Sequence, residues 1–262
     1  ITVSNGQKQL RPNDVVLDML TNRDTTRAVV DCNDFHLNLH ASGGYEKLLR
    51  ALTPFINEMR RQIDDKYLDQ ARLRHRLPEL QLKLQTGEDN FVAQVMHHYG
   101  FDFHSIDMDI TSSPVSGLNG TALGYGLIVD SMAIDTARLN LSSAAKEMAY
   151  SLELQNGKKS KLPFHAFLDG AFTEHGTWIK PRIYDAKGKL GVSMNLMAIM
   201  QNKGIGVHIF GDNPILGYKE FAVNDSNYVY LGSDKRVSAN MKLTAKDGTG
   251  VQIFTDDSNT DA

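Results

Sequence analysis

The sequence predicts a mainly β fold: a curved antiparallel sheet of roughly a dozen strands, interrupted by helical insertions. Two observations lead to this class. Apolar and polar residues alternate over most of the chain after Phe101, and segments rich in Gly, Asn and Asp break the alternation about every 10 to 15 residues. With 262 residues, of which 41% are hydrophobic, the chain is long enough to bury a substantial core.

The first forty residues predict extended structure. In the segment "RAVVDCNDFHLNLHAS" the apolar positions change parity halfway along, from Ala28, Val30 and Cys32 to Phe35, Leu37 and Leu39. Such a change is typical of a β-bulge, which we expect near Asn33 and Asp34. Cys32 is the only cysteine, so an intrachain disulfide is excluded, and its place in a strand favours a small core residue over a reactive thiol.

A helical insertion is predicted over 44–76. Apolar residues recur every three or four positions from Tyr45 to Ile63, which predicts an amphipathic helix over 44–64 with a kink at Pro54. A shorter basic helix completes the insertion. Its mixed charges are typical of a solvated helix face.

A strand and a second short helix follow the insertion. Three leucines alternate with polar residues over 80–84 and predict a strand. The segment 90–99 carries one apolar stripe after Asp89 and Asn90, either of which is a favourable N-cap, and Gly100 stands where a helix ends. The sequence therefore predicts a short helix over 90–99 and, from 101 to 255, a β-meander.

The meander contains strong turn signals. We expect turns at Asn156-Gly157, Lys187-Gly188 and Asp247-Gly248. The long stretch between Leu190 and Met200 alternates without a break, which predicts one continuous strand.

Each predicted strand of the meander offers one apolar face, and three short helices cannot cover so many. The sheet must therefore pack on itself, as a β-sandwich or barrel, or curve around an apolar partner. In the second case the predicted lining of the concavity is Leu162, Phe164, Leu168, Leu190, Val192, Met194, Leu196, Val237, Ala239, Met241 and Leu243.

The sequence gives little evidence for a catalytic or metal-binding site. The segment "HHYGFDFHSIDMD" holds His97, His98, His104, Asp107 and Asp109, but adjacent helical histidines point about 100° apart and suit a helix surface better than a ligand set. The serines lie in loop contexts without a nucleophile-elbow pattern. We therefore predict no catalytic residue, no metal and no cofactor.

Composition narrows the binding partners. A formal net charge of −3 and a pI near 6.3 argue against general affinity for nucleic acid or anionic membrane, because both need a basic footprint. Trp178 is the only tryptophan, which weakens a carbohydrate-binding interpretation. No run approaches the roughly 20 apolar residues of a membrane helix. Because the chain begins at Ile1 rather than Met and ends in "TDDSNTDA" without a terminal helix or strand signal, we expect it to be a piece of a longer protein.

Several segments resemble a known family. The phrases "SSPVSGLNGTALGYGL", "FLDGAF", "NPILGYKEFAVNDSNYVYLGSDKRVSANMKL" and "AKDGTGVQIFTDDSNTDA" look like the translocation-and-assembly-module (TamB) proteins of Gram-negative envelopes, within the AsmA-like superfamily. The resemblance covers the chain from Asp31 to its end. It rests on strands and turns and contains no catalytic motif.

The resemblance implies a fragment of a periplasmic protein anchored in the inner membrane, whose strands form a U-shaped β-groove. Its implied partners are phospholipid and an outer-membrane assembly factor of the Omp85 type. We therefore expect a non-enzymatic segment that shields lipid tails or outer-membrane protein clients between the two membranes. The alternative is a ligand-binding or structural β-sandwich of the envelope, and the predicted helices could plug one end of the groove.

Overall fold

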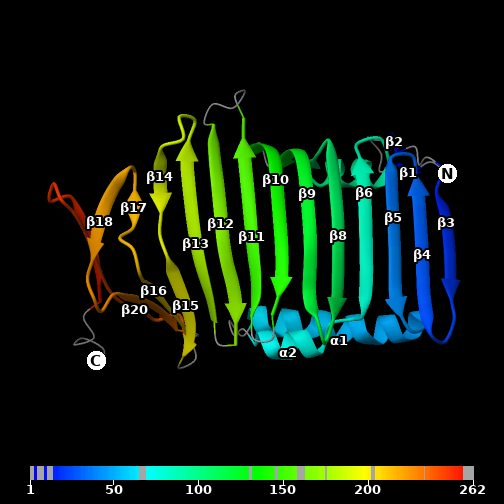
Figure 1. Cartoon of the computed structure of the whole chain (residues 1–262), viewed down its shortest axis with the longest axis horizontal. Helices are drawn as coiled ribbons and strands as arrows, with labels where there is room; N and C mark the ends of the chain where they lie inside the picture. The colour runs from blue at the N-terminus through cyan, green and yellow to red at the C-terminus, as the bar shows by residue number, and fades with distance from the viewer. Residues whose placement is uncertain are drawn as a thin grey trace.

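The computed structural model describes residues 3–4, 9–10, 14–64, 69–129, 132–144, 147–157, 163–174, 176–201, 204–232 and 234–255. In this part of the chain nineteen strands pair into one antiparallel sheet, and β1 (Val3–Ser4) and β2 (Gln9–Leu10) form a separate hairpin. The prediction of a mainly β fold is confirmed. Figure 1 shows the strands side by side along the longest axis of the molecule.

Most strands pair with their neighbours in sequence, but β6 pairs with β8 and β7 with β9, and the order changes again after β13. The first part contains β3 (Val16–Thr21), β4 (Thr25–Cys32), β5 (Phe35–Ser42), β6 (Leu80–Gly87), β7 (Phe101–Asp102), β8 (Ser105–Ser113), β9 (Gly117–Val129) and β10 (Met132–Ser143). The second part contains β11 (Met148–Asn156), β12 (Phe164–Thr173), β13 (Gly176–Asp185), β14 (Leu190–Ser193), β15 (Leu196–Gln201), β16 (Gly204–Ile209), β17 (Ile215–Leu216), β18 (Lys219–Val223), β19 (Tyr228–Gly232), β20 (Val237–Ala245) and β21 (Gly250–Phe254).

Three helices lie within the described residues, at α1 (Tyr45–Asp64), α2 (Gln70–His75) and α3 (Phe91–His98). They fall in the ranges where the sequence predicts two amphipathic helices and the shorter basic helix between them. Because α1 and α2 join the end of β5 to the start of β6, they lie at one end of the strands, as Figure 1 shows. α3 follows the other end of β6.

The parity change near residue 33 is a hairpin turn, so the predicted β-bulge is wrong. Cys32 pairs directly with Phe35, which leaves Asn33 and Asp34 as a two-residue loop. Asn33 takes a positive φ of 53°, a conformation that Asn tolerates better than most residues. A two-residue loop and a bulge both shift the apolar parity along the chain, which explains the error.

Two of the three predicted turns are fully described. The backbone N–H of Asp185 donates to the carbonyl of Lys189 at 3.0 Å around Gly188, and the N–H of Ala245 donates to Thr249 at 2.8 Å around Gly248. Both glycines have positive φ, which suits glycine in tight turns. β11 ends at Asn156, and 158–162 lie outside the described residues.

Asn90 fixes α3 to the sheet. Its side-chain oxygen accepts the N–H of Ala93 at 2.9 Å and caps the helix. Its side-chain nitrogen donates to Asp34 at 2.7 Å and to Thr86 at 2.9 Å. Because Asn90 is fully buried, these bonds satisfy a group that would be costly to bury alone.

A buried carboxylate holds α1 against α2. Glu58 is 4% exposed and accepts from Arg61 at 2.5 Å and from Gln62 at 3.0 Å. Arg72 and Arg76 approach it at 3.6 and 3.5 Å. The hydrogen bonds from Arg61 and Gln62 lower the Glu58 pKa to about 2. The two helices therefore share one ionised group.

Arg74 joins this helical hairpin to the ends of the strands. Its guanidinium donates to the backbone carbonyl of Pro114 at 3.3 Å and also to those of Val115 and Ala144. These carbonyls lie in the connections after β8 and β10. The planar, multi-donor geometry of Arg suits such a contact.

The strand predicted between Leu190 and Met200 is interrupted, so its predicted continuity is wrong. Pro181 lies opposite Met194 and accepts its N–H at 3.3 Å, but proline has no N–H to return the bond. β14 and β15 are therefore two segments on one edge of β13, which pairs with both. Residues 194–195 form a gap between the two strands. The register of pairing with β13 is the same on both sides of this gap.

The sheet divides into two branches beyond this gap. One branch runs through β14, β17 and β18, the other through β15, β16 and β19, and both meet at β20. Asn227, which is buried, extends the pairing of β16 with β19: it accepts from the N–H of Ile209 at 2.7 Å and donates to its carbonyl at 2.9 Å. A side-chain amide thus replaces missing ladder bonds.

The branches enclose a small apolar core, which we call the C-terminal cluster. Phe221, Leu243 and Ala245 are its buried members, and three partly buried residues pack against them. These are Ile209, Leu216 and Val223. The apolar side chains of both branches therefore contact one another at this end of the sheet.

The two edges of the sheet are β3 and β21. Within the described residues β3 pairs only with β4, and β21 only with β20. Every residue of both strands is exposed. Figure 1 places β3 and the C-terminal strands at opposite ends of the long axis. The one closed circuit among the described pairings is thus the local one formed by the two branches.

Most of the sheet has no second layer. The chain exposes 16899 Å², about one and a half times the roughly 11,000 Å² expected of a compact chain of this mass. The described part of the chain contains no second large sheet packed on the first, as a β-sandwich requires. The strands in the middle of the sheet are therefore only partly buried on both faces.

Candidate functional site

One face of the sheet carries a continuous apolar row, which we call the central row. Residues directly opposite one another in antiparallel strands share a face, so the strand registers define the row without ambiguity. Its members, from β3 to the gap after β14, are Leu17, Val30, Leu37, Leu84, Met108, Ala122, Leu139, Leu152, Leu168, Pro181 and Met194.

A parallel row lies two residues away along each strand. It contains only apolar residues, glycine and one tyrosine: Met19, Ala28, Leu39, Leu82, Ile110, Gly120, Leu141, Tyr150, Gly170, Ile179, Leu196 and Ile209. We call the face that holds both rows the apolar face. No Asp, Glu, Lys, Arg or His interrupts either row.

The central row is long. Its eleven residues span ten strand-to-strand steps of about 4.8 Å, which makes about 48 Å. A bilayer hydrocarbon core is about 30 Å thick, so one lipid tail reaches about 15 Å. The apolar face is therefore long enough for more than one tail.

The apolar face is partly accessible to solvent. Five residues of the central row are intermediate in exposure: Leu37, Leu84, Met108, Leu139 and Leu152. A leucine in a two-layer β core would normally be fully buried. Apolar surface of this extent without a covering layer is characteristic of interaction sites.

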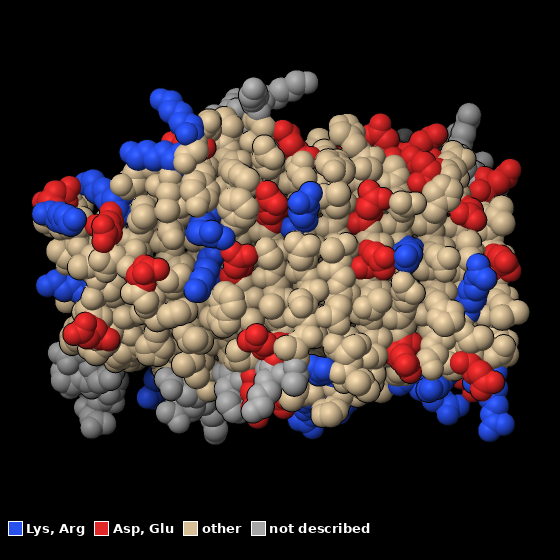
Figure 2. Space-filling model, in the orientation of Figure 1, with Lys and Arg blue, Asp and Glu red and all other residues tan. Residues whose placement is uncertain are grey.

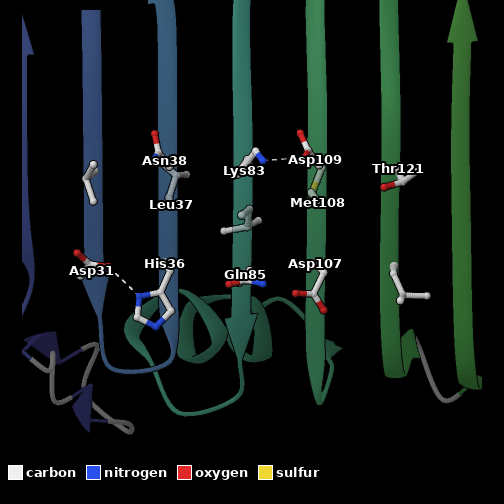
Figure 3. Close-up of a pocket in the computed structure, with 13 residues that line it drawn as sticks. Asp31, His36, Leu37, Asn38, Lys83, Gln85, Asp107, Met108, Asp109 and Thr121 are labelled. Atoms are coloured by element: carbon white, nitrogen blue, oxygen red, sulfur yellow. Dashed lines mark hydrogen bonds and ion pairs between the residues drawn. The ribbon is translucent and has the colours of Figure 1, made fainter.

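The opposite face, which we call the polar face, carries charged groups that pair across strands, together with apolar residues such as Val29 and Leu123. His36 contacts Asp31 at 2.7 Å and Lys83 contacts Asp109 at 3.2 Å, as Figure 3 shows. These residues, with Gln85 and Asp107, line a shallow hollow of about 580 Å³. Because the pairs are about half exposed, they contribute little stability.

The polar pattern continues across the middle of the sheet. His165 contacts Glu153 at 2.8 Å, and Arg182 contacts Asp169 at 2.5 Å. Lys180 lies 5.4 Å from the ring centre of Trp178. Figure 2 shows charges of both signs in small groups over the sheet. The charged groups of these strands therefore gather on this face, where they lie beside apolar side chains such as Leu123, Phe167 and Trp178.

The histidines considered as metal ligands, two predicted on the helix and His104 predicted at the turn after it, have separate partners. His97 pairs with Asp102, and His104 contacts Glu88 at 3.1 Å. His98 packs edge-on against Tyr99. Within the described ranges, no group of three or more His, Cys, Asp or Glu side chains could hold a metal ion.

The predicted lining residues of β12 to β15 fall on the apolar face, with one exception. Phe164 and Leu168 share a face of β12, and Val192, Met194 and Leu196 share the register that puts them beside β13. Leu190 does not join them, because a register shift pairs it with Tyr184 of the polar face. Leu162 lies outside the described residues.

The predicted lining residues of β20 have a different environment. Leu243 belongs to the C-terminal cluster and Ala239 is buried at 1% exposure, whereas Val237 is half exposed. Met241 is intermediate. β20 is separated from β14 and β15 by the strands of the two branches, so these residues do not face the set around Met194 as cross-strand neighbours.

The predicted set omits the N-terminal part of the apolar face. Leu37, Leu84, Met108 and Leu139 lie in the same row as Leu168. Their alternation was visible in the sequence, but only the register places them in one row. The site is thus longer than the predicted lining.

Fold and site together define a largely single-layer antiparallel β protein with one apolar and one polar face. No family model, curated protein or solved structure matches the chain. Among the described residues, no helix is both long enough and apolar enough to span a membrane.

Proposed function

We propose that this chain is a non-enzymatic segment of an envelope protein that shields lipid tails on its apolar face. The observation that carries the proposal is the central row, an unbroken apolar path of eleven residues with no covering layer. Burial of one methylene group contributes about 0.8 kcal/mol. Sheathing most of one tail therefore contributes on the order of 10 kcal/mol before the entropy costs of binding.

The resemblance to TamB proteins supports the same function and suggests its setting. In that setting the sheet is a stretch of a U-shaped groove in the periplasm, and the parent protein is anchored in the inner membrane. The segment contributes to phospholipid transport or outer-membrane protein assembly between the inner and outer membranes. An assembly factor of the Omp85 type is the proposed protein partner.

Two neighbouring residues of β10 provide a matched test. Leu139 lies in the central row, and Asn140 is exposed on the polar face. We expect Leu139→Asp to lower binding of a fluorescent phospholipid at least about tenfold, because the carboxylate interrupts the apolar path. Asn140→Asp adds the same charge on the other face and should leave binding within about twofold.

Circular dichroism distinguishes loss of binding from loss of fold. Leu139 is only half buried, so its carboxylate can remain hydrated, and we expect both variants to keep the strand signal of the parent chain. Native mass spectrometry of the unmodified chain, purified from an envelope fraction, should show co-purifying lipid. Absence of any lipid binding by the unmodified chain, or equal binding by both variants, would contradict the proposal.

A further inference from the structure

A second apolar surface lies on α1, at one end of the strands. Tyr45, Leu49, Ile56 and Met59 recur at helical spacing, and their exposed fractions are 48%, 56%, 39% and 40%. Positions three, four and seven apart lie on one side of a helix. We call this set, with the half-buried Leu52, the α1 stripe.

The contacts of α1 with the rest of the chain leave the stripe uncovered. The buried residues Glu58 and Gln62 contact α2, and Leu48, Ala51 and Pro54 line the hollow between α1 and the strand ends. These residues occupy an adjacent side of the helix. The apolar arc of α1 is therefore wider than the surface that the fold covers.

One basic residue borders the stripe, and others lie on the polar side of the helix. Arg60 follows Ile56 by one turn, whereas Lys47 and Arg50 are exposed farther round α1. Over 45–64 and 69–76 there are seven Lys or Arg against four Asp or Glu, and one of these acids, Glu58, is buried among arginines. The hairpin is thus locally basic in a chain of net charge −3. Figure 2 shows Lys and Arg side chains along the edge where Figure 1 places α1 and α2.

We propose that the α1 stripe docks on the surface of an anionic lipid bilayer, with the helix lying in the plane of the interface. An amphipathic helix with an apolar stripe and Lys or Arg on its polar face is the pattern that binds such surfaces. A second copy of the chain is a poorer occupant, because pairing two stripes would bring two basic hairpins together. Arg74 and Glu58 then hold the docked helix rigidly to the strand ends.

Flotation with lipid vesicles tests this proposal. The vesicles contain phosphatidylglycerol and phosphatidylcholine in a ratio of one to two, with phosphatidylcholine alone for comparison. We expect the chain to bind the anionic vesicles, and Leu49→Gln with Ile56→Gln to lower the partition coefficient at least about tenfold. Thr53→Gln with Asn57→Gln, on the polar side of α1, should change it less than about twofold.

A separate variant tests how much the basic residues contribute to vesicle binding. Arg50→Gln with Arg60→Gln should weaken binding to the anionic vesicles severalfold, and added salt should have a similar effect. The Leu139→Asp chain should float like the unmodified chain, so failure of tail shielding and failure of docking give different results. Equal flotation of the stripe variant and its control would overturn the proposal. So would a dimer that the stripe variant dissociates, without vesicle binding.

Discussion

Met194 donates its backbone N–H to the carbonyl of Pro181 at 3.3 Å, and Pro181 has no N–H to donate in return. This one-sided pair lies in the central row, at the point where β14 and β15 separate. The register continues unchanged across it, so the apolar face is preserved while the ladder is weakened. The division of the sheet into two branches begins at this pair.

Pro181→Val should complete the ladder. Valine supplies the missing donor to the Met194 carbonyl and keeps an apolar side chain on the same face. One added hydrogen bond of about 0.5 to 1.5 kcal/mol should slow amide hydrogen exchange at Met194 by about two- to tenfold. Exchange measured by NMR checks this. Unchanged protection at Met194 would show that other constraints hold the gap open.

Leucines of the C-terminal cluster and of the apolar face should differ in their contribution to stability. Leu243 is 8% exposed inside the cluster, so Leu243→Ala should lower the free energy of unfolding by about 2 to 4 kcal/mol. Leu139 is only half buried, and Leu139→Ala should cost about 1 kcal/mol. Urea unfolding of both variants measures the difference. Equal losses would mean that a closed core surrounds Leu139.

Glu58 should make the fold acid-sensitive. Its pKa is lowered from 4.5 to about 2 by the hydrogen bonds from Arg61 and Gln62. Because the folded state binds the proton less readily, this stabilisation is fully present above about pH 4.5 and is lost as the pH falls to about 2.

Glu58→Gln removes this titration. The thermal midpoint of the variant should therefore fall less steeply than that of the parent chain between pH 5 and pH 2, in the window set by the Glu58 pKa of about 2. Glu46→Gln is the control, because Glu46 is exposed and pairs only with Arg50 at 3.0 Å in the described structure. Parallel pH profiles for Glu58→Gln and the parent would contradict the assignment.

Local sequence patterns predicted the type of most elements. The unbroken helical period from Tyr45 to Ile63 and the Asn90 cap correspond to α1 and α3, because both signals come from neighbours in the chain. The loop at Asn33 was misread, because parity alone does not separate a bulge from a two-residue turn. Pro181 offered a warning of the broken strand, since proline cannot donate to a ladder.

The sequence said less about which strands pair and about what covers each face of the sheet. Alternation showed that Leu139 and Leu152 each lie on an apolar face of a strand, but only the register makes them cross-strand neighbours. Alternation alone also did not distinguish Leu243, in a closed cluster, from Leu168, on the partly exposed face. Parity gives the face of a strand, and what covers that face depends on contacts far along the chain.

The missing second layer has a mechanical consequence. A sheet whose middle strands have no packed layer resists bending mainly through its backbone hydrogen bonds, so it is more compliant than a two-layer core of the same length. Lipid tails on the apolar face of this sheet would act as that absent layer. Stiffness and resistance to unfolding would then rise with cargo, since a ligand that binds only the folded state stabilises it. On the proposed function, the empty sheet would flex to admit a tail, and the filled one would hold its shape.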